Sequence, residues 1–275
     1  MKGLVLTSIV VDHVTVDFPI YGASQQSLRH TLLSRTGGLI RREGERRNQR
    51  VIVRALDDVA FTLSSGDRIG LVGHNGAGKS TLLRVIAGVY TPTSGTVRVD
   101  GRISPLLNAA PGLDPEDSGY ENIKTCGMFL GMSPDELGRK LPEIAEFSEL
   151  GEYLDLPIRT YSTGMVTRLC FAIATAIDPD ILLLDEGIAA GDARFASRAE
   201  GRMRALIERT RILVLASHSE ILIRTLCNRG VLLEKGRVVE LGPIDRIFDE
   251  YRRRNAEAAA QVAPVPPAAT EATPQ

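Results

Sequence analysis

The stretch that decides the fold is "GHNGAGKST" at residues 73–81. It satisfies the pattern G-x-x-x-x-G-K-[ST], in which glycines allow backbone N–H groups to surround a phosphate. The apolar run "RIGLVG" at 68–73 comes before it, and "TLLRVIAG" at 81–88 has the spacing of a helix. Strand, glycine-rich loop and helix in this order are the setting of a phosphate-binding loop. A glycine-rich turn without function is the alternative, and this context disfavours it.

The loop residues are expected to have distinct roles. We expect the Lys79 ammonium to reach the β- and γ-phosphates of a nucleotide and the Ser80 hydroxyl to bind Mg²⁺. The His74 side chain occupies a variable position of the motif and is assigned no chemistry. The residues predicted to line the nucleotide are Gly73, His74, Asn75, Gly76, Ala77, Gly78, Lys79, Ser80 and Thr81.

A second candidate element is "ILLLDE" at 181–186, an apolar run that ends in two carboxylates. Successive side chains of a strand point to opposite faces, so Asp185 and Glu186 are expected to have different roles. We expect Asp185 to hold Mg²⁺ through water and Glu186 to act as general base for an attacking water. Two acids that end an ordinary strand are often plain solvated surface, but the phosphate loop in the same chain favours the functional interpretation.

A histidine follows another apolar run, in "ASHS" at 216–219. A lone histidine at a strand end is more often structural than catalytic. His218 differs because we expect its strand to lie beside the strand of the 181–186 run, which would place the imidazole near the γ-phosphate.

Length and composition fit a globular α/β protein. The chain has 275 residues, of which 43% are hydrophobic, enough for one large domain or two small ones. Its formal net charge of −1 provides no global field for nucleic acid. The apolar runs are much shorter than the roughly 20 residues that span a bilayer. Cys126, Cys170 and Cys227 have no metal-like spacing, and we interpret them as reduced thiols of the core.

Strand-like and helical segments alternate along most of the chain, which predicts a mostly parallel sheet with helices on both faces. The strand-like segments are 8–18, 51–63, 68–72, 181–184, 211–216 and 230–240, and the helical ones are 79–88, 164–176, 193–209 and 219–227.

The middle of the chain departs from this alternation. Helical patterns without an intervening strand predict an inserted α-helical subdomain at about 112–163. Ser133 and Glu136 have the spacing of a capping box at the start of a helix, and Pro142 is expected to kink or split that helix.

The motifs together resemble the ATP-binding subunit of an ABC transporter. The resemblance depends on the phosphate loop, "YSTGM" at 161–165, "GIAAGD" at 187–192 and the histidine after the next strand. It covers about residues 8–250 and implies an N-terminal antiparallel β part beside the nucleotide-binding core. We therefore predict a domain at 1–255, followed by an Ala/Pro-rich tail at 256–275 that is too poor in bulky apolar residues to order itself.

The resemblance also implies a dimer. In that family two subunits pair head to tail, and each ATP lies between the phosphate loop of one subunit and the signature turn of the other. An aromatic residue at the end of the first strand stacks on adenine, here Phe18 or alternatively Tyr21. The other residues that the resemblance adds to the site are Ser162, Thr163, Gly164 and Asp192.

A narrower resemblance is to exporters of bacterial cell-surface polysaccharides of the O-antigen, capsule or teichoic acid type. It depends on the basic connection at 24–50, the "YSTGM" signature and "DEGIAAGDARF" at 185–195. It implies a separate integral-membrane permease, a lipid-linked glycan and a location at the cytoplasmic face of the inner membrane. The alternatives are an importer ATPase, which would keep a glutamine loop, and a soluble switch protein of translation or DNA repair, which would carry two ATP domains or a coiled-coil insertion.

Two features leave alternatives open. Asn108 lies nearest the position of the usual glutamine, so it is either a candidate Mg²⁺ contact or a loop asparagine without function. The arginine-rich connection at 24–50, with a short helical pattern at 27–35, is either a solvated loop or a contact for anionic head groups or glycan-lipid phosphates. It lacks interleaved aromatic residues, which disfavours nucleic acid as its partner.

Overall fold

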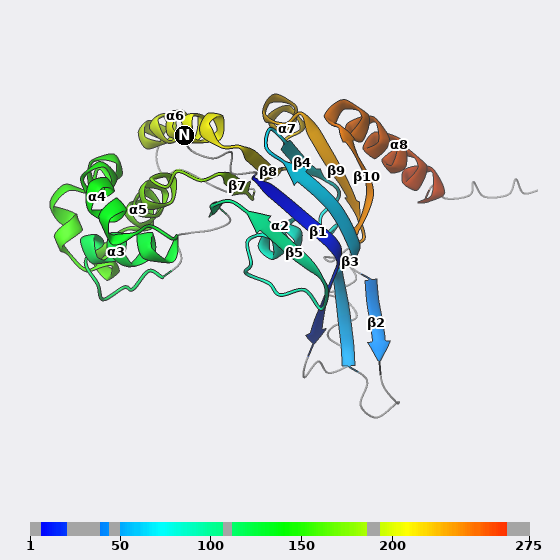
Figure 1. The fold of residues 1–275 in the computed structure, drawn as a ribbon, viewed down its shortest axis with the longest axis horizontal. Coiled ribbons are helices and arrows are strands. Elements are labelled where there is room, and N and C mark those ends of the chain that lie inside the picture. Colours follow the sequence, from blue (N-terminus) through cyan, green and yellow to red (C-terminus); the bar gives the residue numbers. More distant parts are fainter. Residues whose placement is uncertain (1–6, 21–38, 44–49, 107–111, 186–192, 263–275) are drawn as a thin grey trace, which may run out of the picture.

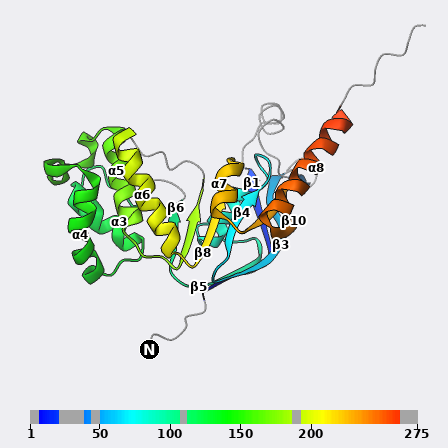
Figure 2. The ribbon, with the colours of Figure 1, turned by 90° about the horizontal axis from the view of Figure 1, so that it is seen from above.

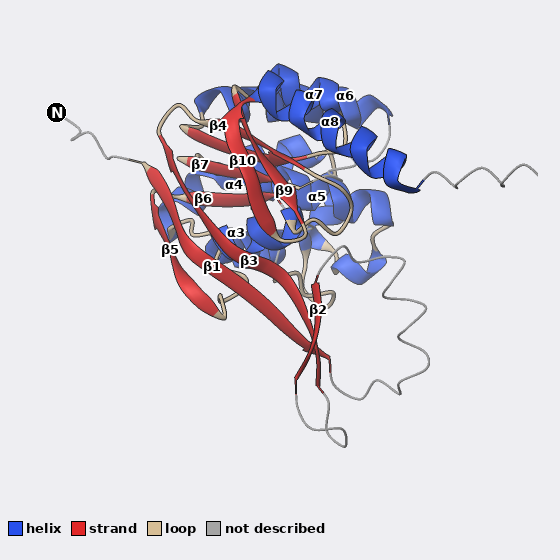
Figure 3. Ribbon diagram, turned by 90° about the vertical axis from the view of Figure 1, so that its right-hand side faces the viewer, coloured by secondary structure: helices blue, strands red, loops and turns tan. Residues whose placement is uncertain are grey.

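The computed structural model describes residues 7–20, 39–43, 50–106, 112–185 and 193–262. Two sheets lie beside a group of helices (Figure 1). The smaller sheet is antiparallel with the strand order β2-β3-β1-β5. Its strands are β1 Ser8–Ile20, β2 Leu39–Glu43, β3 Arg50–Ser64 and β5 Ser94–Asp100. In Figure 3 the long strands β1 and β3 run side by side, and the short β2 lies along one end of β3.

The larger sheet has the strand order β10-β9-β4-β8-β7-β6. Neighbouring strands from β9 to β6 pair in parallel, and β10 pairs with β9 in antiparallel orientation at the edge. The mostly parallel sheet and the N-terminal antiparallel part are therefore confirmed. The strands are β4 Arg68–Val72, β6 Ile103–Leu106, β7 Ile181–Leu184, β8 Ile212–Ala216, β9 Arg229–Glu234 and β10 Arg237–Pro243.

Alternate side chains of the larger sheet enter two separate cores. In β8, Val214 packs in the core shared with helix α2 (Lys79–Ile86) and the antiparallel sheet. The neighbouring Leu213 packs in the core on the opposite face. Three helices cover that second face, namely α6 Ala193–Arg209, α7 Glu220–Leu226 and α8 Ile244–Val262. Each fully buried side chain of this size contributes about 1.5–3 kcal/mol, so burial on both faces holds the layers together.

A third core belongs to the helical part of the chain, which lies to one side of the sheets (Figure 2). Its central members include Ile123, Ile144 and Leu169, all fully buried. The helices are α3 Gly119–Phe129, α4 Pro134–Ser148 and α5 Thr163–Thr175, with short 3₁₀ turns at Gly151–Asp155 and Ile158–Thr160. The subdomain boundary at 112–163 stays a prediction.

The strand prediction at 230–240 is wrong in one respect. The chain turns back at Lys235 and Gly236, with φ angles of 50° and 81°, and forms the β9–β10 hairpin. A two-residue turn with both φ angles positive matches the twist of the paired strands. The sequence analysis did not predict strands β2, β5 and β6, because short strands at the edge of a sheet have little hydrophobic alternation of their own.

Helix α4 begins differently from the prediction. The Ser133 hydroxyl accepts a hydrogen bond from the Glu136 N–H. The Glu136 carboxylate accepts instead from Arg102 Nη1 at 2.9 Å, which joins the helical part to the sheet. The complete capping box lies at the start of α3, between Ser118 and Glu121. The Glu136 side chain thus forms an ion pair with Arg102 in place of the predicted capping bond to the Ser133 N–H.

Helix α4 is also not split at Pro142. Proline removes one helical hydrogen bond, which costs several kcal/mol in an isolated helix. Ile144 and Phe147 follow the proline and are buried against the helical core, so packing holds the last turn in place.

The predicted boundary of the tail is wrong, since α8 extends through Val262 and includes residues 256–262. Ile247 and Phe248 anchor the helix on the sheet. Arg253 then pairs with Glu257 one turn later, which favours continued helix. Residues 263–275 lie outside the described residues.

Cys126, Cys170 and Cys227 are all buried, and none of them forms a disulfide. Burial raises the pKa of the Cys126 thiol to about 11 and that of Cys227 to about 12. Both are therefore protonated and unreactive at neutral pH, which agrees with core thiols.

Candidate nucleotide-binding site

The glycine-rich loop connects β4 to α2, and its glycines have backbone conformations that other residues rarely adopt. Gly73 has φ 152°, and Gly78, the N-cap of α2, has φ 107°. A Cβ atom on Gly73 would overlap the Leu233 carbonyl oxygen, and one on Gly78 would lie 2.8 Å from the Ala55 carbonyl oxygen. The loop is therefore packed backbone to backbone, and the first N–H groups of α2 open into it.

Lys79, the first residue of α2, is buried and folds back over the loop. Its ammonium donates to the Gly73 carbonyl at 2.6 Å and to the His74 carbonyl at 3.1 Å. A positive charge is thus held where the predicted phosphate would lie. The His74 ring contacts the Tyr251 ring of α8, with centroids 5.3 Å apart. Asn75 is exposed, and Thr81 is half-buried in the first turn of α2.

Ser80 and Asp185 meet at the carboxyl edge of the sheet. The Ser80 hydroxyl donates to Asp185 Oδ1 at 3.1 Å. Within the described residues no three His, Cys, Asp or Glu side chains form a metal cluster. One hydroxyl and one carboxylate suit Mg²⁺, which prefers oxygen ligands and keeps several waters or phosphate oxygens. The residues present therefore fit a nucleotide-bound Mg²⁺.

His218 follows β8, which lies between β4 and β7 and is parallel to both. Leu215 of β8 is opposite Leu184 of β7, the residue before Asp185. The prediction that the strand before His218 adjoins the strand of Asp185 is confirmed. The exposed His218 follows β8 by two residues, at the edge where ligands bind in open α/β sheets.

The signature turn opens α5 in the helical part of the chain. Ser162 is the N-cap, and its hydroxyl accepts from the Met165 N–H at 3.3 Å, while Thr163 begins the helix. A Cβ atom on Gly164 would meet only the Ser162 hydroxyl oxygen, at 3.9 Å. Internal packing therefore does not explain this glycine. Helices α5 and α2 also pack in different hydrophobic cores, so the two phosphate-type turns lie in separate parts of the chain.

Phe18 lies near the end of β1 and is 36% exposed. Its ring meets the Tyr90 ring edge to face, with centroids 5.3 Å apart. Tyr90 comes shortly after α2, so the phosphate-loop helix and the predicted adenine-stacking residue are neighbours. The remaining predicted residues, Tyr21, Asn108, Glu186 and Asp192, lie outside the described residues.

The chain is similar to known proteins over the segments that carry the phosphate loop, the signature turn and Asp185. The family model described as "ABC transporter" matches residues 56–189. The O-antigen export system ATP-binding protein RfbE of Yersinia enterocolitica is 50% identical over 236 residues, 86% of this chain and 98% of that protein. The chain belongs to the ATP-binding proteins of the ABC transporter family. An ABC transporter ATP-binding domain binds and hydrolyses ATP, which agrees with the loop and the Ser80–Asp185 contact.

Two further comparisons describe the extent of the ABC transporter resemblance. The O-antigen export system ATP-binding protein RfbB of Myxococcus xanthus is 42% identical over 80% of this chain, and the chain spans 51% of that protein's length. A solved structure described as dimeric, of a bacterial ABC transporter cassette, has a TM-score of 0.59 at 21% identity and covers 86% of this chain and 98% of its own. The predicted fold class is thereby confirmed. Among the residues that the structure describes, no helix is both long and apolar enough to cross a membrane.

Sequence reasoning missed the contact between the β9–β10 hairpin and the phosphate loop. The Gly236 N–H donates to the Ala77 carbonyl at 3.0 Å, and the Gly236 carbonyl accepts from the Asp57 N–H at 2.8 Å. The only local signal was the glycine in "EKGR" at 234–237, which marks a turn but not what the turn touches.

Proposed function

We propose that this chain is the ATP-hydrolysing subunit that powers export of a lipid-linked cell-surface polysaccharide through a separate membrane permease. The observation that carries the ATPase part is the Ser80–Asp185 hydrogen bond beside the glycine loop. The export part is supported by the two O-antigen export relatives, one of which is matched over nearly its whole length. Neither relative supports the importer or soluble-switch alternative.

In this proposal one subunit binds the triphosphate. The loop N–H groups and the Lys79 ammonium neutralise the phosphate oxygens, and Ser80 and Asp185 hold Mg²⁺ beside them. Mg²⁺, when bound, stabilises the negative charge that moves between phosphate oxygens during hydrolysis. Asn108 is proposed as a further metal contact. Phe18, which is 36% exposed, is proposed to stack on the base.

Glu186 and His218 are proposed to act on the water and the terminal phosphate. Glu186 directly follows Asp185, so its carboxylate is assigned the role of general base. His218 follows the adjacent parallel strand and is assigned a hydrogen bond to the γ-phosphate. A positioned base of this kind raises the rate roughly 10²- to 10⁴-fold.

A second copy of the chain is proposed to complete each site. Ser162, Thr163 and Gly164 would contact the phosphate held by the partner, and Asp192 would lie at the same seam. The open space around Gly164 supports this assignment, because a glycine without an internal packing role allows a close approach from outside. Without the partner the phosphate would face water, where electrostatic stabilisation is weak.

The permease is proposed to dock on the helical part of the chain at the cytoplasmic face of the inner membrane. Met128 and Phe129 at the end of α3 are 54% and 69% exposed. The Phe129 ring occupies the space where a Cβ atom of Gly112 would lie. Exposed apolar side chains of this size support a protein contact. Any glycan contact of this chain would be indirect, through the permease.

Affinity purification of the full chain from detergent-solubilised membranes tests the proposal. The expected result is recovery of a multi-span membrane protein, together with a rate of ATP turnover per subunit that rises with subunit concentration. Recovery of ribosomes or DNA, or turnover per subunit that does not depend on concentration, would contradict it.

A further inference from the structure

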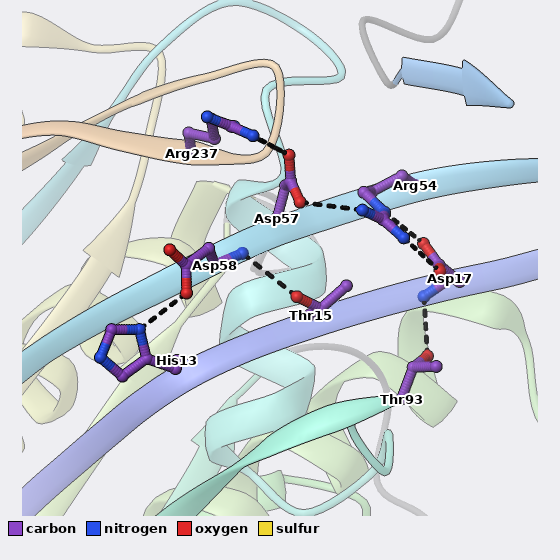
Figure 4. A network of polar contacts seen from close by, with 8 residues as sticks. All are labelled: His13, Thr15, Asp17, Arg54, Asp57, Asp58, Thr93 and Arg237. Carbon is purple, nitrogen blue, oxygen red and sulfur yellow. Dashed lines mark hydrogen bonds and ion pairs between the residues drawn. The ribbon is translucent and has the colours of Figure 1, made fainter.

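Four charged side chains form a connected series between the phosphate loop and the end of β1 (Figure 4). The members of this series, the Arg54 network, are Asp17, Arg54, Asp57 and Arg237. Arg54 Nε and Nη2 donate to the two Asp17 carboxylate oxygens at 2.8 and 2.9 Å. Arg54 Nη1 donates to Asp57 Oδ1 at 3.0 Å, and Arg237 Nε donates to Asp57 Oδ2 at 2.8 Å.

One end of the network reaches the phosphate loop through backbone. The Asp57 N–H donates to Gly236, and Gly236 donates in turn to the Ala77 carbonyl of the loop. A Cβ atom on Gly236 would lie 2.7 Å from the Ala55 carbonyl oxygen. Strand β3, the hairpin turn and the loop are thus in direct backbone contact, and these bonds do not involve the Arg54 side chain.

The other end reaches the aromatic residue proposed for the base. Asp17 directly precedes Phe18, and the Asp17 N–H donates to the Thr93 hydroxyl at 3.0 Å. The pairing of β1 with β3 is interrupted by three register shifts, the last between Val16 and Asp17. Immediately after that shift Asp17 is paired with Arg54. The bidentate ion pair therefore fixes the register at the point from which Phe18 projects.

Burial distinguishes this network from an ordinary surface pair. The side chains of Arg54, Asp17 and Asp57 are 18%, 16% and 7% exposed. A neighbouring pair on the same two strands, His13 and Asp58, is 71% and 65% exposed. Arg237, at the hairpin end of the network, is 62% exposed. The exposed His13–Asp58 pair is screened by water and fixes little, whereas the buried Asp17–Arg54–Asp57 part of the network holds its geometry.

We propose that the Arg54 network sets the position of Phe18 relative to the phosphate loop, so that Arg54 and Asp57 are positioning residues for the base of the nucleotide. The inference rests on the proposed function, because it assumes that Phe18 and the loop bind opposite ends of one ATP. A ligand held at two ends loses affinity when their relative position is lost, whereas a ligand held only by the loop does not.

The test compares two ligands on the full-length chain by calorimetry, Mg²⁺–ATP and Mg²⁺–tripolyphosphate, which has no base. Arg54→Met removes the charge and keeps much of the bulk, and Arg54→Lys keeps the charge but cannot make all three bonds. Asp58→Asn is the matched control, since Asn tolerates the positive φ of 58° at that position. Thermal unfolding of each variant establishes that it is folded.

Arg54→Met is expected to weaken ATP binding about tenfold and tripolyphosphate binding less than about twofold, in line with the loss of one base–aromatic stack. Arg54→Lys should show a smaller loss of the same kind, and Asp58→Asn should change neither affinity. In a Phe18→Ala background Arg54→Met should cost no further ATP affinity. Equal losses for both ligands, or no loss for ATP, would overturn the inference. Absence of ATP binding by the unaltered chain would instead overturn the proposed function.

Discussion

The Ser80 hydroxyl donates a hydrogen bond to Asp185 over 3.1 Å, although the two residues are 105 positions apart in the chain. Ser80 belongs to the first turn of α2, and Asp185 follows β7, which is separated from β4 by β8. The fold thus brings a hydroxyl and a carboxylate together beside a loop built to hold phosphate.

Replacement of Asp185 should expose its role as a metal ligand. Asp185→Asn is expected to lower kcat at least about 100-fold and to raise the Mg²⁺ concentration needed for half-maximal activity, because a charged oxygen ligand is lost. Ser80→Ala should act in the same direction more weakly. The control is Ser104→Ala, a buried serine of the nearby strand β6. An unchanged Mg²⁺ titration of Asp185→Asn would remove Asp185 from the metal site.

Glu186→Gln should separate ATP binding from turnover. The amide keeps the size of the side chain but cannot accept a proton, so kcat is expected to fall about 10²- to 10⁴-fold while ATP still binds. The variant should accumulate as a dimer with ATP, which size-exclusion chromatography measures. Glu200→Gln on the exposed face of α6 is the control. Wild-type turnover by Glu186→Gln would exclude Glu186 as the base.

Gly164→Val tests whether the signature turn faces a second copy. Since a Cβ atom added at Gly164 has only the Ser162 hydroxyl oxygen within 4 Å, the free energy of unfolding should change by less than about 1 kcal/mol. ATP turnover should nevertheless be lost, because the new side chain would occupy the approach to the partner's phosphate. Gly138→Val, at an open and exposed position of α4, should leave turnover intact. Full activity of Gly164→Val would contradict the shared site.

Asp57 should contribute stability that depends on pH. Burial raises the pKa of its carboxyl, but the hydrogen bonds and charges of Arg237 and then Arg54 outweigh burial, so the pKa lies below the ordinary value of 3.8. A lowered folded-state pKa means that this stabilisation is fully present above pH 3.8 and is lost as the pH falls through the lower folded-state value.

Asp57→Asn is therefore expected to lower the free energy of unfolding by about 2–3 kcal/mol at pH 7, since Arg54 and Arg237 lose a buried partner. Urea unfolding at a series of pH values measures the effect. The difference between the variant and the unaltered chain should shrink below pH 3.8. A difference that stays constant down to the acid limit would show that the Asp57 charge has no part in it.

The amino-acid sequence alone determined the local elements of the site. The loop at 73–81 and the carboxylates that end the 181–186 run are readable because each depends on residues adjacent in the chain. The same holds for the strands and helices that carry them, whose apolar side chains repeat with a regular period.

Only the tertiary structure decided how these elements meet. The Glu136 carboxylate pairs with Arg102 instead of capping its own helix. Helix α8, anchored on the sheet by Ile247 and Phe248, extends to Val262. Helix α4 continues through Pro142 because the residues after the proline are packed in the helical core. The Arg54 network could likewise not be predicted from the sequence, because the chain has many arginines and nothing next to Arg54 indicates which carboxylate it pairs with. Contacts between distant segments depend on which strands become neighbours and on how much water they exclude, and neither quantity is encoded in any short stretch of the chain.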